Sequence, residues 1–141
     1  MRLIGFNFEK MNSERFSDSS ESRKYNTKID LSNISTLKSG FIKLKDEILK
    51  VSFNYSVSYE PNYAKIELTG NLLISIEPKL AREILRDWQD KKTPEDFRIF
   101  LFNVIIRKAN IKALQLEDDL GLPPHVPFPS LKKQEPKEEK Q

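Results

Sequence analysis

The side chains best suited to acid–base or metal chemistry are few in this sequence and stand apart from one another. His125 is the single histidine among 141 residues, and its segment is rich in proline. The chain has no cysteine, which excludes disulfides and thiolate metal ligands. With no second histidine or cysteine to share a metal ion, His125 is expected to be a solvated loop histidine, and no metal site is predicted.

The acidic run Glu117–Asp119 offers carboxylates, but adjacent residues of a helix point in directions about 100° apart. We therefore interpret this run as a solvated helix face. The four glycines are scattered, so the sequence holds no phosphate-cradling loop, and the motifs G-x-S-x-G, H-E-x-x-H and paired C-x-x-C do not occur. The sequence predicts a protein that is not an enzyme and needs no cofactor.

The composition is typical of one small domain. The net charge of +3 comes from 24 basic and 21 acidic residues that are well interspersed, which gives solubility but is too weak to indicate nucleic-acid binding. Residues 1–8 meet polar side chains too early for a signal peptide, so a cytoplasmic protein is expected. We expect a single domain over residues 1–131 and a charged, disordered tail over residues 132–141.

Alternation of apolar and polar residues predicts strands in the first half of the chain. A loose alternation predicts a first strand near residues 3–11, followed by a polar, mobile loop over residues 12–26. A weaker strand is expected around Lys28–Leu31. Residues 32–47 leave a short strand and a packed loop open as alternatives. The apolar residues on which this choice depends are Phe41, Ile42 and Leu44.

The clearest pattern is a long antiparallel hairpin over Leu49–Ile76. Apolar residues alternate without exception over residues 49–59, and the phase reverses after the tip. One register puts every apolar side chain on the same face of the hairpin. Because Pro61 cannot take a positive φ, a type I turn is expected at the tip. The predicted register pairs are Tyr59 with Ala64, Val57 with Ile66 and Phe53 with Gly70.

Start signals for two helices follow the hairpin. The first helix is expected over residues 78–90, with a proline in its first turn and one narrow apolar stripe. The second starts at Thr93–Asp96, where Thr93 suits the N-cap and two acids lie at the positive end of the helix dipole. This second helix is expected to reach about Ala109.

The sequence beyond Ala109 leaves the shape of the second helix open. It can continue to Leu120, kinked or restarted at Asn110, with Gly121 as its C-terminal cap. Residues 122–129 contain four prolines, which forbid a helix or the interior of a sheet. This segment is therefore expected to be extended.

The second helix also contains the most apolar stretch of the chain. Between Phe97 and Ile106, eight of ten residues are apolar, and they point in every direction around a helix. Such a helix must be buried all round, yet the run is shorter than the about 20 residues that cross a bilayer. A sheet can cover one face, so a second copy of the chain is expected to cover the other. The residues expected at this oligomer interface are Phe97, Ile99, Phe102 and Ile106.

The order of these elements resembles the SecB protein-export chaperone family and is most similar to its archaeal-type SecB-like proteins. The resemblance rests on the opening strand Gly5–Phe8, the hairpin Leu49–Ile76 and the segment Arg98–Leu131 with its Leu-Pro-Pro-His-Val-Pro-Phe-Pro-Ser-Leu ending. It covers most of residues 3–131. It implies an α+β protomer with a four-stranded antiparallel sheet followed by two or three C-terminal helices.

The resemblance also implies a function. It points to an ATP-independent holdase chaperone that binds unfolded or nascent polypeptides, such as preproteins, in hydrophobic grooves and keeps them export-competent. The family implies a cytoplasmic dimer of dimers, a homotetramer, that serves protein transport and contacts the translocation machinery. The alternatives are a chaperone that guards the antitoxin of a toxin–antitoxin pair and an oligomeric adaptor for one folded partner. Neither nucleic-acid binding nor membrane insertion is expected.

Several aromatic side chains suit either the core or a binding groove. Tyr55 and Tyr59 lie on the core side of the hairpin, where they either pack under the helices or border a groove for apolar ligands. Trp88 is either a core residue or an anchor. The proline-stiffened arm near the C-terminus either straps the domain or edges a groove. The residues expected to bind clients are Tyr55, Tyr59, Trp88, Val126, Phe128 and Leu131.

Overall fold

The structure is a computed structural model that describes residues 1–17, 24–37, 45–127, 129 and 131. It has the predicted α+β fold, in which four strands precede two helices. The strands form one antiparallel sheet in the order β1-β4-β3-β2, so β1 and β2 are its edges. The elements are β1 (Arg2–Arg15), β2 (Lys24–Leu37), β3 (Glu47–Glu60), β4 (Ala64–Ile76), α1 (Pro78–Trp88) and α2 (Glu95–Leu120).

Both edge strands are longer than predicted. β1 pairs with β4 as far as Arg15, and β2 pairs with β3 from Lys24 onward. The mobile loop predicted for residues 12–26 is therefore wrong at both of its described ends. These ends are polar and carry no apolar alternation, but a ladder of backbone hydrogen bonds to the central strands forms regardless of side-chain type. Residues 18–23 of that loop lie outside the described residues. So do Phe41, Ile42 and Leu44, on which the choice between a short strand and a packed loop depends.

The central hairpin of β3 and β4 has the predicted register. Tyr59 lies opposite Ala64, Val57 opposite Ile66 and Phe53 opposite Gly70. The structure also explains the glycine. A Cβ atom at Gly70 would lie 2.2 Å from the backbone oxygen of Asn7 on β1 and 3.0 Å from the ring of Phe53. Only glycine therefore lets β1 and the aromatic ring approach β4 this closely.

Two predictions about the ends of elements are wrong. At the tip of the hairpin, Asn62 has a φ of 49°, whereas a type I turn needs a negative φ there, so the turn is not of type I. At the start of α2, the N-cap is Pro94 rather than Thr93, and no side chain caps the helix. The second helix begins one residue later than the capping pattern suggests.

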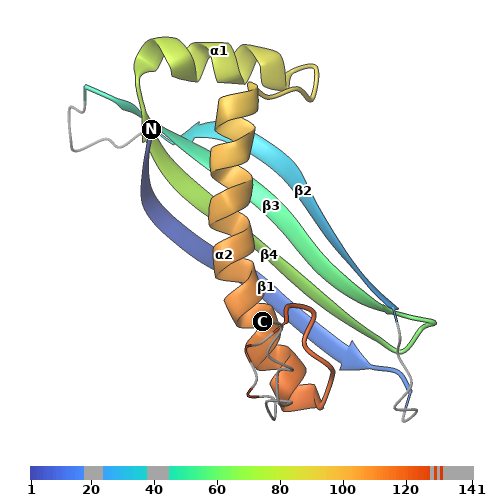
Figure 1. The fold of residues 1–141 in the computed structure, drawn as a ribbon. Coiled ribbons are helices and arrows are strands. Elements are labelled where there is room, and N and C mark those ends of the chain that lie inside the picture. The colour runs from blue at the N-terminus through green and yellow to red at the C-terminus, as the bar shows by residue number, and fades with distance from the viewer. Residues whose placement is uncertain (18–23, 38–44, 128, 130, 132–141) are drawn as a thin grey trace, which may run out of the picture.

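α2 crosses the inner face of the sheet diagonally, as Figure 1 shows. From Phe97 to Glu117 every fourth residue is buried. Four residues turn a helix by about 400°, so the face in contact shifts by about 40° at each step and follows the twist of the sheet. The helix is therefore one element to Leu120, without a restart at Asn110, and Gly121 ends it with a φ of 66°. The buried series is Phe97, Leu101, Ile105, Ala109, Ala113 and Glu117.

α1 lies across one end of the sheet and crosswise to α2 (Figure 1). The backbone of α1 lies nearest to β2 and β3, whereas that of α2 lies nearest to β1 and β4 and reaches β3 through side chains. The inner face of β2 is consequently less covered than that of the central strands, and Ile29 and Leu31 are only partly buried there. This difference in cover creates the open region described below.

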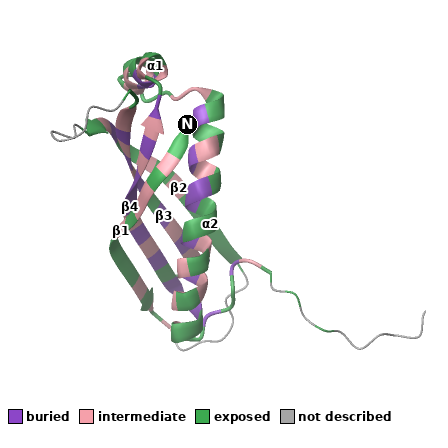
Figure 2. Cartoon of the chain, turned by 90° about the vertical axis from the view of Figure 1, so that its left-hand side faces the viewer, coloured by how far each residue is buried: buried purple, intermediate pink, exposed green. Residues whose placement is uncertain are grey.

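The apolar run of α2 is buried on one side only. Its sheet-facing side is buried and its other side is largely exposed (Figure 2). Ile99 is 50% exposed and Ile106 is 39% exposed. One protomer therefore covers one side of the run, as expected, and burial of the other side by a second copy stays a prediction. Over the part of the chain that the structure describes, no helix combines the length and the hydropathy needed to cross a membrane.

Candidate functional site

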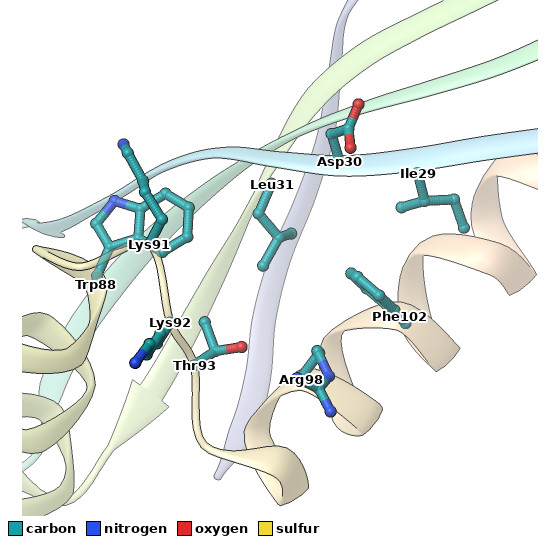
Figure 3. A pocket seen from close by; sticks show the side chains of 9 residues that line it. All are labelled: Ile29, Asp30, Leu31, Trp88, Lys91, Lys92, Thr93, Arg98 and Phe102. Carbon is teal, nitrogen blue, oxygen red and sulfur yellow. The ribbon is translucent and has the colours of Figure 1, made fainter.

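A pocket of about 480 Å³ opens between β2, the end of α1 and the first turns of α2 (Figure 3). Ligand sites in proteins typically measure about 300–1,000 Å³, so the pocket has room for side chains of a partner. We call it the β2 pocket. Its lining residues are Ile29, Asp30, Leu31, Trp88, Lys91, Lys92, Thr93, Arg98 and Phe102.

The apolar part of the β2 pocket comes from three elements. Ile29 and Leu31 point inward from β2, and Phe102 points toward them from α2 (Figure 3). Trp88 closes the side formed by the end of α1. All four side chains are only partly buried. An apolar surface that is incompletely removed from water favours contact with apolar groups of a partner.

β2 also offers backbone groups beside this pocket. It pairs with β3 on one side over its length, apart from a bulge between Leu31 and Asn33, and within the described sheet no strand pairs with its other side. An extended peptide can add to such an edge through backbone hydrogen bonds while its side chains enter neighbouring pockets. The β2 pocket and the β2 edge together suit an extended polypeptide better than a small molecule.

Three cationic side chains border the β2 pocket. Lys91 and Lys92 come from the loop between α1 and α2, and Arg98 comes from the first turns of α2. The ammonium group of Lys91 lies 4.7 Å from the centre of the Trp88 ring, which is a cation–π contact. The apolar walls are thus bordered by positive charge.

A second group of polar side chains lies toward the C-terminal end of α2. Tyr55 and Tyr59 of β3 meet Asn110 and Glu117 of α2 and His125 of the following segment. We call these five residues the tyrosine–histidine cluster. The side chains of Glu117 and His125 are only 1% and 3% exposed.

The Glu117 carboxylate is the centre of the tyrosine–histidine cluster. It accepts hydrogen bonds from the Tyr59 hydroxyl at 2.9 Å, from the His125 backbone N–H at 3.0 Å and from the His125 ring at Nδ1. The other ring nitrogen, Nε2, lies 2.7 Å from the Tyr55 hydroxyl and 3.1 Å from Oδ1 of Asn110. No buried side-chain nitrogen or oxygen of the described residues lacks a partner, so the cluster is fully satisfied.

The environment of the cluster keeps both tyrosines protonated. Burial raises the pKa of Tyr55, and the negative charge of Glu117 raises it further. Burial also raises the pKa of Tyr59, together with its hydrogen bond to Glu117. Both hydroxyls therefore remain hydrogen-bond donors far above neutral pH. The cluster ties the sheet, α2 and the C-terminal segment together.

The cluster corrects two predictions. His125 is not a solvated loop histidine, because the segment after α2 folds back over the sheet. Glu117 is not part of a solvated face, although Asp118 and Asp119 are exposed as predicted. The signal that was missed is the four-residue spacing of buried positions, which continues from the apolar part of α2 to Glu117. In the described chain, no group of three or more His, Cys, Asp or Glu residues is arranged to hold a metal ion.

The end of α2 explains how His125 reaches Glu117. Gly121 adopts the left-handed conformation, and its N–H donates to the Asp118 carbonyl at 3.2 Å. The Leu122 N–H donates to the Glu117 carbonyl at 2.8 Å. This pair of bonds is a Schellman motif, which reverses the chain direction after a helix. The buried side chain of Leu122 then holds the returning segment against the core.

The structure divides the residues predicted to bind clients. Trp88 lines the β2 pocket. Tyr55 and Tyr59 instead pack under α2 in the tyrosine–histidine cluster, which decides between the two alternatives for these residues. The sequence analysis missed Ile29 and Leu31, although their positions on one face of a predicted strand carried a signal.

The remaining predicted residues lie on the segment after α2. Val126 is half-buried next to His125, and Leu131 is fully exposed. Phe128 is outside the described residues. Neither Val126 nor Leu131 lines the β2 pocket, and the part of all three residues in binding stays a prediction.

The predicted interface residues also separate. Phe97 is buried inside the protomer, which corrects its placement at an interface between copies. Ile99 and Ile106 are exposed on one face of α2, with the partly buried Phe102 beside them. We call Ile99, Phe102 and Ile106 the α2 stripe. Phe102 belongs to the α2 stripe and lines the β2 pocket as well.

The strand order and the two C-terminal helices define a SecB-like α+β fold, as predicted. Among solved structures, the chain is similar to the Rv1957 SecB-like chaperone of Mycobacterium tuberculosis in complex with a ChAD peptide from the Rv1956 HigA1 antitoxin. The TM-score is 0.51 at 8% sequence identity, and the match covers 95% of this chain and 92% of that chain. No protein-family model and no curated protein matches the sequence. The similarity therefore shows the fold.

Proposed function

We propose that this protein is an ATP-independent chaperone that binds unfolded polypeptide segments at the β2 pocket and the adjacent β2 edge. The observation that carries the proposal is the set of four partly exposed apolar side chains beside an edge strand that has no second neighbour among the described strands. Unfolded chains offer apolar side chains and unpaired backbone groups, and this site can satisfy both. The absence of a phosphate-binding loop from the sequence supports binding without nucleotide.

Two kinds of client fit this proposal. A holdase for preproteins would keep many unrelated chains export-competent, in the cytoplasm and with the translocation machinery as a further partner. A chaperone of a toxin–antitoxin pair would bind one antitoxin segment. The structural neighbour is a SecB-like chaperone bound to an antitoxin peptide, which favours the second client type as a specific alternative. The two differ in promiscuity, which an aggregation assay measures directly.

We further propose that the protein assembles with itself, as a dimer or a dimer of dimers. Ile99 and Ile106 of the α2 stripe are large apolar side chains that one protomer leaves exposed. An interface of standard size needs about 800 Å² from each partner, which the exposed side of α2 and its flanks can supply. Assembly would also place the β2 pockets of several protomers on one particle.

The test of the chaperone function is the aggregation of several unrelated unfolded proteins, followed by light scattering without ATP. Wild-type protein in stoichiometric excess is expected to slow aggregation of all of them. Leu31→Ser removes an apolar wall of the β2 pocket and should weaken this effect severalfold. Leu37→Ser is the matched control, because Leu37 is an exposed leucine of the same strand that does not line the pocket.

The outcome separates the candidates. Protection of every client, lost in Leu31→Ser and kept in Leu37→Ser, supports a general holdase at the β2 pocket. Protection of an antitoxin alone would support the toxin–antitoxin alternative. If aggregation is equally fast with and without the wild-type protein, the chaperone function is wrong, and a specific adaptor for a folded partner takes its place.

A further inference from the structure

We propose that the β2 pocket selects polypeptide segments in which an apolar anchor residue has acidic side chains two positions away. This inference rests on the proposed function and names the class of polypeptide that the site prefers. The observation behind it is the contrast between the apolar walls of the β2 pocket and its cationic border. The positive charge gathered at this border favours acidic segments, which the weak net charge of +3 spread over the whole chain would not do.

The charges that line the pocket are unequal. Three cations, Lys91, Lys92 and Arg98, stand against one carboxylate, that of Asp30. Asp30 points to the other face of β2, away from the inward-pointing Leu31 (Figure 3). Its carboxylate also lies 3.7 Å from the ammonium group of Lys28 on that outer face. The charge that a bound segment meets inside the pocket is therefore positive.

Nearby acidic side chains do not neutralise the border. Lys92 and Arg98 form no ion pair with any carboxylate of the described residues. Glu95 and Asp96, in the first turn of α2, line a separate pocket with Met1 and Leu80. Asp87, in the last turn of α1, and Asp90, just after this helix, are not part of the β2 pocket lining. Lys92 and Arg98 are exposed and available to a partner.

The geometry favours acids at a fixed spacing from the anchor. In an extended segment, side chains two positions apart lie on the same face, about 6.8 Å from one another. An anchor placed between Leu31 and Phe102 would direct its second neighbours along the pocket, toward the loop and the first turns of α2. The ammonium group of Lys91 is held over Trp88, so one cation is already positioned against the aromatic wall.

The expected size of the preference follows from the exposure of these cations. Ion pairs at exposed positions are weak and are screened by salt, with a Debye length of about 10 Å at 0.1 M. Two such pairs together predict that an acidic segment binds roughly tenfold more tightly than a basic one at low salt. The difference should shrink severalfold at 0.5 M salt, whereas the apolar contribution to binding should remain.

The experiment uses three synthetic peptides that differ only at the flanking positions. Each has a central Phe anchor in an otherwise Ser-rich sequence, with Glu, Gln or Lys two positions before and after the anchor. Trp88 is the single tryptophan and lines the pocket, so its fluorescence reports binding. The full-length protein should bind the Glu peptide more tightly than the Gln peptide, and the Lys peptide most weakly.

Charge reversal tests the assignment to the pocket. The double variant Lys92→Glu with Arg98→Glu should invert the order, so that the Lys peptide binds most tightly. The matched control is Lys10→Glu with Lys50→Glu, which makes the same change in net charge on β1 and β3 at positions outside the pocket. This control should keep the order of the wild type. Circular dichroism checks that each variant is folded.

The outcomes distinguish failure of this inference from failure of the proposed function. If all three peptides bind equally, or if the control inverts the order as well, the acidic preference is wrong while the chaperone site remains. If none of the three peptides binds, including the neutral one, the β2 pocket is not a polypeptide site and both proposals fail. The wild type alone gives a second test: the difference in affinity between the Glu and Lys peptides should shrink at 0.5 M salt, and a difference that does not change would also contradict the acidic preference.

Discussion

The two ends of α2 treat their charged side chains in opposite ways: one end buries and pairs its charge, and the other leaves its charge exposed. Near its C-terminal end, Glu117 carries a buried charge that accepts hydrogen bonds from Tyr59 and His125. Near its N-terminal end, Arg98 carries an exposed charge without an ion-pair partner in the described chain, beside the partly exposed Phe102. The charged group at the C-terminal end therefore has its hydrogen-bond partners within the protomer, whereas the charged group at the N-terminal end can still pair with another molecule.

One end of α2 therefore stabilises the fold, and the other is available to bind a partner. A buried charged group must be paired, because an unpaired one costs several kcal/mol. The tyrosine–histidine cluster meets that requirement inside the protomer and leaves nothing for a partner. The β2 pocket keeps its apolar and cationic groups exposed to solvent, so a partner can still gain by covering them. Substitutions at the two ends should therefore act on different measurements.

The largest expected effect on stability is that of Glu117→Ala. It removes the acceptor of two N–H groups of His125 and leaves them buried without that partner. It also removes one of two acceptors of the Tyr59 hydroxyl, which still has the Pro123 carbonyl oxygen at 2.6 Å. Breaking a buried pair from one side costs about 3–5 kcal/mol of unfolding free energy. Chemical denaturation followed by circular dichroism measures this loss.

Asp118→Ala is the matched control for that substitution. Asp118 is the next residue of the same helix turn but is exposed, so its replacement should change the unfolding free energy by no more than about 0.5 kcal/mol. Equal denaturation midpoints for Glu117→Ala and the wild type would show that the cluster does not hold the fold. The contrast drawn between the two ends of α2 would then be lost.

The sequence predicted well those parts of the fold that depend on local apolar patterns. The register of β3 and β4 followed from strict alternation, because a shift by one residue would move every apolar side chain to the wrong face. The end of α2 followed from Gly121, since a left-handed residue there suits glycine. The edge strands were predicted too short, because polar residues at their ends pair by backbone hydrogen bonds that leave no sequence signal.

The candidate site was only partly predictable for a physical reason. Burial of a histidine or a glutamate depends on a partner far along the chain, and the cluster joins Tyr55 to His125 across 70 residues. The four-residue spacing along α2 marks the position of Glu117, but no local pattern identifies Tyr55 as the partner of His125. Trp88 was predicted as an anchor, but Leu31 and Phe102 become pocket walls only because β2, α1 and α2 meet there, which a local pattern does not show.

A smaller effect on the unfolding free energy is expected at alkaline pH, and it tests the burial of the two tyrosines of the tyrosine–histidine cluster. Burial raises the pKa of Tyr55 and Tyr59 in the folded state, whereas in the unfolded state both ionise near pH 10. Their contribution to stability is therefore fully present below about pH 10 and is lost as the pH rises above it. The unfolding free energy should fall with rising pH in that range.

Tyr59→Phe isolates this contribution. The variant has lost one group with a raised pKa, so its unfolding free energy should fall less steeply above about pH 10 than that of the wild type. The comparison is between slopes, because the substitution also removes hydrogen bonds and lowers stability at neutral pH by about 1–3 kcal/mol. Identical slopes in urea titrations from pH 9 to 11 would mean that Tyr59 does not keep its proton in the folded state.

The smallest effect on the protomer itself is expected for Ile99→Asp combined with Ile106→Asp. Both side chains are exposed, so the fold should stay intact, but charges on the α2 stripe should prevent its burial against a second copy. Ile111→Asp is the matched control, because Ile111 is also an exposed isoleucine of α2 and lies about 120° around the helix from Ile99. Light scattering at micromolar concentration should give an oligomer for the wild type and the control, and a monomer for the double variant. A wild type that is already monomeric at high concentration would contradict self-assembly, and it would leave the open end of α2 to polypeptide partners alone.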